Sequence, residues 1–274
     1  MPDLNLSVRY YALRMARGKR CDEKTFRHAT LNWRIPPQEA AVILVDCWDK
    51  HYIASHEERS RKITLDRIKP VLEACRTAGV TVVHAPSPPT AKHFPQWIRY
   101  AGEAEINGAG PTAAPAWPPQ GFRQRQGKYA QFAKPKDPVL DEWLKTHERL
   151  IIPEIAPIED DFVIATGAQL HRLLTHKQIL HLFYAGFAAN MCVPFRDYGM
   201  RAMKDRGYNI ILLRDCTSAI EAHSTVADFQ LTQDAIINTE MTVGHTCTSA
   251  ELIKACCAAA KKAPSGKRRS AVRV

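Results

Sequence analysis

Short apolar runs and amphipathic segments alternate along most of the chain. The apolar runs have the length and composition of buried strands and lie at 41–45, 80–85, 162–165, 179–187 and 208–213. The segments with helical spacing of apolar residues lie at 63–78, 139–144, 169–176, 194–206, 225–237 and 249–261. Strands that alternate with helices are typical of a parallel sheet covered on both faces. We therefore predict an α/β fold, a single three-layer α/β/α domain with a mostly parallel sheet.

Prolines and glycines mark where this regular pattern stops. Gly79 is expected to end the helix at 63–78, and Pro70 is expected to bend or split it. Residues 86–138 contain 10 of the 18 prolines of the chain, which is too many for regular elements. We expect this segment to be a long insertion that leaves the compact core, as lids and interaction segments do.

The distribution of charge separates the two ends of the chain from its middle. The net charge of the 274 residues is +10, with +5 on residues 1–34, +7 on residues 254–274 and only −2 between them. We divide the chain into a basic N-terminal extension (1–34), a domain (35–260) whose organised sequence begins at Ala41, and a basic tail (261–274) expected to be disordered. The domain carries no recognised nucleic-acid motif, so nucleic acid is not an expected partner.

The apolar and cysteine patterns exclude several classes of protein. No apolar run approaches the roughly 18 residues of a membrane helix, and the N-terminus lacks the apolar stretch of a secretory signal. The eight cysteines show neither paired spacing nor the Cys–His pattern of zinc sites. We therefore expect a cytoplasmic protein with reduced thiols, no membrane partner, no metal and no cofactor.

Two reactive side chains follow predicted strands. Asp46 comes directly after the strand at 41–45, and Cys192 lies five residues after the strand at 179–187, near a helix start. Because the carboxyl ends of parallel strands meet at one edge of the sheet, both should lie at that edge. The helix dipole is expected to lower the pKa of Cys192, while Asp46 takes up and returns its proton. With the backbone N–H groups of residues 188–192 as an oxyanion hole, this set could attack a carbonyl or amide carbon.

Each of these residues also has a plainer interpretation. A cysteine in an apolar chain is commonly a small buried residue, and Asp46 alone could be a structural cap or a metal ligand. Trp48 fits either a pocket wall or the core. His84 ends a strand at the same edge and fits either a structural or a substrate-binding histidine. Gln169 begins a helix nearby and is a candidate for binding a substrate amide.

Four segments carry a similarity to a known family: VILVDCWDKHY, VTVVHAPSP, LFYAGFAANMCV and RDYGMRAMKDRGYNIILLRDCTSA. Together they resemble the isochorismatase-like cysteine hydrolase superfamily, over residues 40–255 apart from the insertion. The resemblance implies the isochorismatase-like hydrolase fold, with Asp46 as general base and Cys192 as nucleophile. It also implies an oxyanion hole from the amides of Ala188 and Cys192, and a cis peptide bond between Phe187 and Ala188. Phe187 joins Trp48, His84 and Gln169 as a candidate for substrate binding.

The sequence departs from the family at two points. The family's catalytic Lys would fall at the end of the third predicted strand, where Ala165 is the nearest residue and no Lys is present. Lys128 and Lys134 in the insertion are candidate replacements, although each also fits a solvated surface charge. The Asp and His that nicotinamidases use to bind metal are missing as well. The lone Asp49-x-His51 pair fits a polar helix start better than a metal site.

We predict a metal-free cysteine hydrolase that cleaves a small amide, carbamoyl or related C–N bond through a covalent intermediate on Cys192. The missing Lys supports an alternative, a catalytically altered or inactive protein of the same fold that acts as a binding or scaffold module. A third hypothesis places nucleic acid on the basic ends, where Lys- and Arg-rich tails are commonly non-specific. A small-molecule substrate is expected, and the resemblance implies a homo-oligomer, either a dimer or a tetramer.

Overall fold

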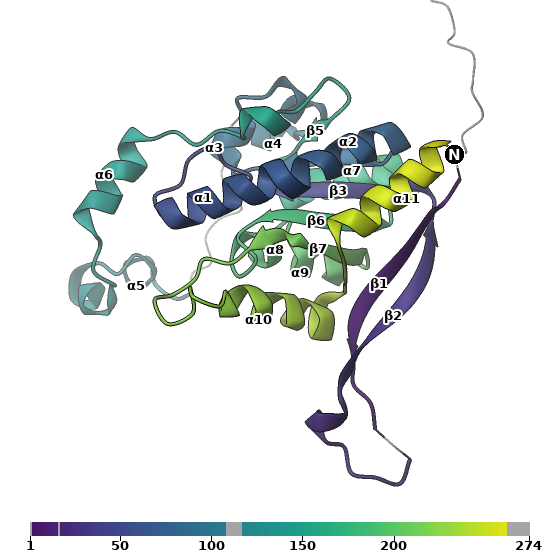
Figure 1. Cartoon of the computed structure of the whole chain (residues 1–274). Coiled ribbons are helices and arrows are strands. Elements are labelled where there is room, and N and C mark those ends of the chain that lie inside the picture. Colours follow the sequence, from purple (N-terminus) through teal and green to yellow (C-terminus); the bar gives the residue numbers. More distant parts are fainter. Residues whose placement is uncertain (1, 16, 108–116, 262–274) are drawn as a thin grey trace, which may run out of the picture.

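The computed structural model describes residues 2–15, 17–107 and 117–261 (Figure 1). Its eight-stranded sheet has the order β2-β1-β8-β7-β6-β3-β4-β5. The strands are β1 (Leu4–Ala12), β2 (Arg27–Ile35), β3 (Ala40–Val45), β4 (Thr81–Ala85), β5 (Phe162–Val163), β6 (His181–Phe187), β7 (Asn209–Ser218) and β8 (His245–Cys247). Pairings from β8 to β5 are parallel, whereas β1 is antiparallel to both β2 and β8. The mostly parallel sheet confirms the prediction.

The centre of the sheet is β3, which is apolar along its whole length because protein covers both of its faces. All six of its residues are buried. Val42 lies opposite Val82 of β4 on one side and Phe183 of β6 on the other. An uninterrupted apolar run is the expected composition of such a strand. It places the residue that follows, Asp46, at the carboxyl edge of the sheet.

Helices cover the two faces of the sheet (Figure 1). They are α1 (Ala54–Ile63), α2 (Lys69–Ala78), α3 (Pro88–Ala91), α4 (Glu103–Ile106), α5 (Gln120–Arg123), α6 (Pro138–Thr146), α7 (Gly167–Lys177), α8 (Cys192–Phe195), α9 (Met200–Asp205), α10 (Gln230–Asn238) and α11 (Ser249–Lys261). On one face α2 and α11 pack together and contribute Leu72 and Cys256 to the core. On the other face α7 and α9 contribute Leu173 and Met203 to a second apolar cluster. These layers confirm the predicted α/β/α arrangement.

The first long helical segment is continuous through Pro70. A π-helical turn, η3 (Thr64–Ile68), joins α1 to α2. Pro70 lies in the first turn of α2, where a missing N–H is tolerated. Gly79 ends α2 with φ 72°, as predicted. The segment begins at Ala54, earlier than its apolar spacing indicated. In place of the bend or split expected near Pro70, the π-helical turn η3 separates α1 from α2.

The N-terminal segment is an ordered part of the sheet. β1 and β2 form a long antiparallel hairpin that extends away from the body of the molecule (Figure 1), and Arg9 lies opposite Thr246 of β8. The prediction that organised sequence begins at Ala41 is therefore wrong. The available signal was the alternation of Leu4 and Leu6, both buried, with polar neighbours. The many basic residues of this segment obscured that alternation.

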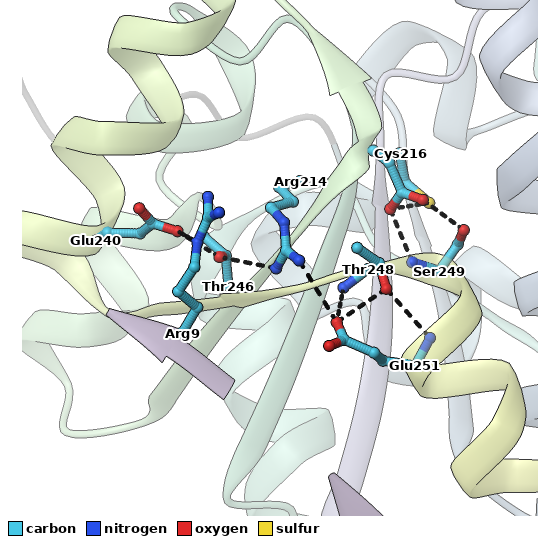
Figure 2. A network of polar contacts seen from close by, with 9 residues as sticks. Arg9, Arg214, Cys216, Glu240, Thr246, Thr248, Ser249 and Glu251 are labelled. Atoms are coloured by element: carbon cyan, nitrogen blue, oxygen red, sulfur yellow. Dashed lines mark hydrogen bonds and ion pairs between the residues drawn. The ribbon is translucent and has the colours of Figure 1, made fainter. Parts of the chain in front are cut away.

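A buried carboxylate, Glu240, attaches the hairpin to the body of the protein (Figure 2). Its Oε1 accepts hydrogen bonds from Nε of Arg9 at 2.7 Å and from the hydroxyl of Thr246 at 2.5 Å. Its Oε2 lies 2.9 Å from Nε2 of His28 on β2. Figure 2 shows the network continuing from Thr246 to Arg214 of β7. Because a buried charge without partners is strongly destabilising, these contacts fix the hairpin in place.

The Pro-rich insertion is built from short helical turns, including α3, α4 and α5. Part of it packs on the domain, since Trp97 is buried against Val163 and Ala165. Residues 108–116 of the insertion lie outside the described residues. Residues 262–274 do so as well, and with them the prediction of a disordered tail. No helix in the described part of the chain has the length and apolar character needed to cross a membrane.

Candidate active site

A cavity opens at the carboxyl edge of the sheet, beside the ends of β3 and β6. Its volume is about 120 Å³, which is below the range of about 300–1,000 Å³ typical of drug-sized ligand sites. The residues that line it include Asp46, Trp48, Arg149, Phe187, Ala188 and Cys192. The structure thus brings Asp46 and Cys192 together, as their positions after two strands predicted.

Asp46 is placed by a sharp turn at the end of β3. Its backbone is in the left-handed region with φ 46°, a conformation that Asp adopts more readily than most residues. The N–H of Asp46 donates to the carbonyl of Ala85 at 3.3 Å, and the N–H of Trp48 donates to the carbonyl of Asp46 at 2.9 Å. The residue is only 2% exposed. Within the described residues its Oδ1 accepts no hydrogen bond, so this oxygen is available to take a proton.

Glycine at position 186 allows the end of β6 to lie against the end of β3. A Cβ at Gly186 would lie 2.0 Å from the carbonyl oxygen of Val45. The backbone φ of Gly186 is 109°, which side chains other than glycine rarely adopt. The hydroxyl of Thr217 on β7 donates to the carbonyl of Gly186 at 2.7 Å. The residues that follow β6 are therefore brought next to Asp46.

The turn between β6 and α8 is held to the segment after β7. The Phe187–Ala188 peptide bond is cis, at the position that the family resemblance implies. The side-chain amide of Asn190 donates to the carbonyl of Ile220 at 3.0 Å and accepts from the N–H of Ile220 at 3.1 Å. These bonds fix the backbone that carries Cys192.

Cys192 begins α8, and its thiol faces the carboxyl group of Asp46. Burial and the neighbouring Asp46 raise the pKa of Cys192 to about 12, and Arg196 only partly opposes them. The prediction of a lowered pKa is therefore wrong. The helix α8 has four residues, too few for a strong dipole, and the negative charge beside the thiol outweighs it. At neutral pH the resting side chain is a thiol.

Ala188 and Cys192, the two residues expected to supply an oxyanion hole, both line the cavity. The carbonyl of Ala188 is engaged inside the turn, where it accepts the N–H groups of Met191 at 3.0 Å and Val193 at 3.2 Å. The N–H of Ala188 faces the sulfur of Cys192, and this contact is one of the effects that oppose the rise in the thiol pKa. A backbone donor therefore lies beside the candidate nucleophile.

Arg196 lies beside Asp46 and was not predicted from the sequence. Its guanidinium contacts Oδ2 of Asp46, with Nη2 at 3.1 Å and Nε at 3.4 Å. Burial raises the pKa of Asp46, and Arg196 is the strongest of the effects that lower it. The signal was spacing, because Arg196 follows Cys192 by four residues and such residues share one side of a helical turn.

Two of the four candidate substrate-binding residues, Trp48 and Phe187, line the cavity. His84 does not. It is buried at the end of β4, where its Nε2 lies 3.2 Å from Oδ2 of Asp161. Burial lowers the pKa of His84, so the imidazole is a neutral structural group.

Gln169 also lies away from the cavity. Its side chain is fully buried, and its amide oxygen accepts the N–H of Ala165 at 2.8 Å. Its amide nitrogen donates to the carbonyl of Trp97 at 2.6 Å. Both ends of the amide are used within the protein, which corrects the expectation that Gln169 binds a substrate amide.

Two histidines add aromatic surface to the cavity. The rings of His51 and Tyr52 stack with centroids 4.3 Å apart, and His51 meets His56 edge-on at 4.8 Å. Burial lowers the pKa of His51. Burial, His51 and Arg59 together lower the pKa of His56 to about 4. Both imidazoles are neutral at pH 7 and contribute ring surface without charge.

Arg149 brings a guanidinium to the lining of the cavity and was also missed from the sequence. Its segment pairs with the loop after β3, since Trp48 and Ile151 form an antiparallel bridge and the N–H of Asp49 donates to the carbonyl of Leu150 at 2.9 Å. The guanidinium carbon lies 4.0 Å from the centroid of the Trp48 ring. No local pattern signals this contact, because the two residues lie far apart in the chain.

Comparison with known proteins identifies the family. The sequence model of the isochorismatase domain matches residues 40–251. The chain belongs to the isochorismatase family. A cysteine hydrolase from Pseudomonas syringae pv. phaseolicola 1448A has a similar fold, with 19% identity and a TM-score of 0.55 over 83% of this chain and 96% of that chain. The resemblance predicted from the sequence segments is thereby confirmed, and with it membership of a family of hydrolases.

Two further solved structures are more distant. An isochorismatase from Pseudomonas putida KT2440 is 17% identical, with a TM-score of 0.46 over 78% of this chain and 90% of that chain. An N-carbamoylsarcosine amidase from Thermoplasma acidophilum is 16% identical, with a TM-score of 0.44 over 78% of this chain and 98% of that chain.

The resemblance implies a lysine as the cation of the site. In this isochorismatase-family chain, the cation beside Asp46 is Arg196, which comes from a different segment. Ala165, the residue nearest to the expected lysine position, is buried against Trp97. Lys128 and Lys134 are exposed and do not line the cavity. The two candidate replacements are therefore corrected, because Arg196 supplies the charge beside Asp46.

The Asp49 and His51 pair shapes the loop after β3. Oδ1 of Asp49 accepts the N–H of Leu150 at 2.8 Å, and Nδ1 of His51 accepts the N–H of Ile53 at 3.0 Å. Across the described ranges, no group of three or more His, Cys, Asp or Glu side chains is arranged to hold a metal ion.

Proposed function

We propose that this protein cleaves the C–N bond of a small amide or carbamoyl compound through a covalent intermediate on Cys192. The observation that carries the proposal is the pairing of the Cys192 thiol with the buried carboxylate of Asp46 inside a small cavity. Membership of a hydrolase family supports the same class of reaction.

In the first half of the reaction Asp46 acts as the general base. As the sulfur of Cys192 bonds to the carbonyl carbon, its proton passes to the free Oδ1 of Asp46. Burial strengthens this base because it raises the carboxyl pKa. The carbonyl oxygen becomes negative, and the N–H groups of Ala188 and Cys192 stabilise it. The C–N bond then breaks, and the leaving nitrogen takes the proton from Asp46.

The second half releases the acyl group from Cys192. Water attacks the thioester carbon and gives its proton to Asp46, and the C–S bond breaks to leave an acid product. The sulfur recovers its proton from Asp46, which restores the resting thiol. Arg196 opposes the effect of burial on Asp46 between these transfers, because an adjacent positive charge favours the carboxylate.

Release of ammonia or amine from a panel of small amides and carbamoyl compounds tests the proposal. Native protein and the control variant C257A, which lacks an exposed cysteine far from the site, should both turn over the substrate. C192A should not, and mass spectrometry should find the acyl adduct on Cys192 of native protein. Full turnover by C192A would contradict the covalent mechanism. No turnover of any compound, and no adduct, would favour the binding or scaffold module.

The expected homo-oligomer, dimer or tetramer, and the cytoplasmic location remain predictions. Light scattering on the purified full chain measures the molar mass in solution and decides between one, two and four copies.

A further inference from the structure

One guanidinium of the cavity lining forms no ion pair with any described residue. Arg196 is paired with Asp46 at 3.1 Å. Arg149 forms no ion pair with any residue in the described part of the chain. The other carboxylate of the cavity, Glu57, accepts the backbone N–H of His51 at 2.6 Å through its Oε2. With the lining histidines neutral, Arg149 is the unpaired positive group of this cavity.

Arg149 is held in position by its backbone on both sides. Its carbonyl accepts the hydroxyl proton of Thr90 at 2.7 Å. The next residue, Leu150, donates its N–H to Oδ1 of Asp49 at 2.8 Å. The guanidinium lies over the ring of Trp48 at 4.0 Å. A side chain that is already placed loses little freedom when it binds a ligand.

Within the described residues, the guanidinium of Arg149 contacts the Trp48 ring but donates no hydrogen bond. The N–H donors of a guanidinium form a planar fork that matches the two oxygens of a carboxylate. The positive charge of Arg149 also acts on the carboxyl group of Asp46. Burial raises the pKa of Asp46, Arg196 lowers it most strongly, and Arg149 lowers it further.

We infer that Arg149 binds a carboxylate of the substrate, so that the substrate class is small acids that carry a cleavable amide or carbamoyl group. This inference rests on the proposed function, because Cys192 marks where the acyl carbon must lie. The carboxylate binds the N–H donors of Arg149, and the body of the substrate lies against Trp48 and Phe187. The volume of about 120 Å³ limits that body to a compact group.

Two alkylating reagents that differ in one charge test the inference without a known substrate. Iodoacetate and iodoacetamide react in the same way, since sulfur bonds to the CH₂ carbon, iodide leaves and the thiol proton is lost. The rate of modification of Cys192 by each reagent is measured by peptide mass spectrometry at one pH. The exposed Cys257 provides an internal reference in every sample. The variants are R149Q, R149K and the control R125Q, which removes an arginine that also lies over an aromatic ring, Phe122, at 4.3 Å, outside the cavity.

The iodoacetate-to-iodoacetamide rate ratio at Cys192 should fall at least about five-fold in R149Q, as expected for loss of a charge-assisted contact. It should stay unchanged in R125Q and be partly retained in R149K. If iodoacetamide modifies Cys192 but R149Q leaves the ratio as in R125Q, the inference is overturned and the proposed function stands. If neither reagent modifies Cys192 of native protein, the proposed function fails and the inference falls with it.

Discussion

Arg196 forms an ion pair with Asp46 at 3.1 Å. The Asp46 side chain is 1% exposed, whereas that of Arg196 is 33% exposed. The cation therefore comes from the solvent side and offsets the burial of a carboxylate that would otherwise favour its neutral form. The same helical turn carries Cys192, so one short segment places both the thiol and the charge that controls its base.

Substitution R196M should move the acid limb of the kcat/KM profile to higher pH by about one unit. Asp46 must be ionised to accept the thiol proton, so the rate falls as the pH drops through its pKa. Loss of Arg196 raises that pKa further, whereas R196K keeps a positive charge and should shift the limb less. The control is R201M, which removes an arginine that lies over the ring of Phe195 at 5.3 Å. A pH–rate profile with the same limb in R196M and R201M would contradict the assignment.

Substitution D46N should separate thiol acidity from activity. The negative charge of Asp46 is one cause, after burial, of the raised pKa of Cys192, so D46N should lower that pKa from about 12. Turnover should nevertheless fall by about 10²–10⁴-fold, because the base is lost. Thiolate absorbance against pH gives the first quantity and steady-state kinetics the second. A D46N variant with a more acidic thiol and undiminished turnover would exclude Asp46 as the base.

Gly186→Ala should disrupt the site far more than Gly207→Ala. Both glycines have positive φ, 109° and 93°, so alanine at either position costs about 1–3 kcal/mol of backbone strain. A Cβ at Gly207 has no atom within 4 Å, whereas at Gly186 it would lie 2.0 Å from the carbonyl oxygen of Val45. Urea unfolding and turnover measure the two effects. Equal losses in the two variants would show that the close approach of β6 to β3 is unimportant.

His84 should make the stability of the fold depend on pH. Burial lowers its pKa, so below about pH 6.5 the unfolded chain binds a proton that the folded chain does not. The free energy of unfolding should therefore fall as the pH drops from 7.5 toward the folded-state pKa. H84L should weaken this dependence and reduce stability at pH 7.5 by about 1–3 kcal/mol, because Asp161 loses a buried partner.

Urea unfolding at pH 7.5 and 5.5 measures this effect. The control is H93L, which removes a half-exposed histidine that pairs with Glu148 at the surface. If H84L and native protein lose the same stability between the two pH values, the buried histidine is not the cause.

The parallel core could be predicted because its strands are covered on both faces. The apolar runs at 41–45 and 179–187 leave no polar face to obscure them, and they agree with β3 and β6 to within two residues. The hairpin could not be found in this way. Most positions of β2 are exposed, so its sequence resembles a charged surface segment, and β8 is only three residues long.

At the site, Asp46 and Cys192 could be predicted because each lies just beyond a recognisable strand. Arg149 could not, because its contact with Trp48 depends on a bridge between distant segments. The pKa of Cys192 was predicted in the wrong direction for a related reason. The helix start is visible in the sequence, but the burial of the thiol and the nearness of Asp46 exist only in the folded chain.

The match to the family does not include the hairpin that extends the sheet of this protein. Glu240 lies inside the matched stretch 40–251, whereas Arg9 and His28 lie outside it. A fragment trimmed to that stretch would leave Glu240 without its contacts to Arg9 and His28. It would also leave the edge of β8 open to strand pairing between molecules. Recombinant versions of the domain should therefore keep both strands of the hairpin, β1 and β2, together with the matched stretch.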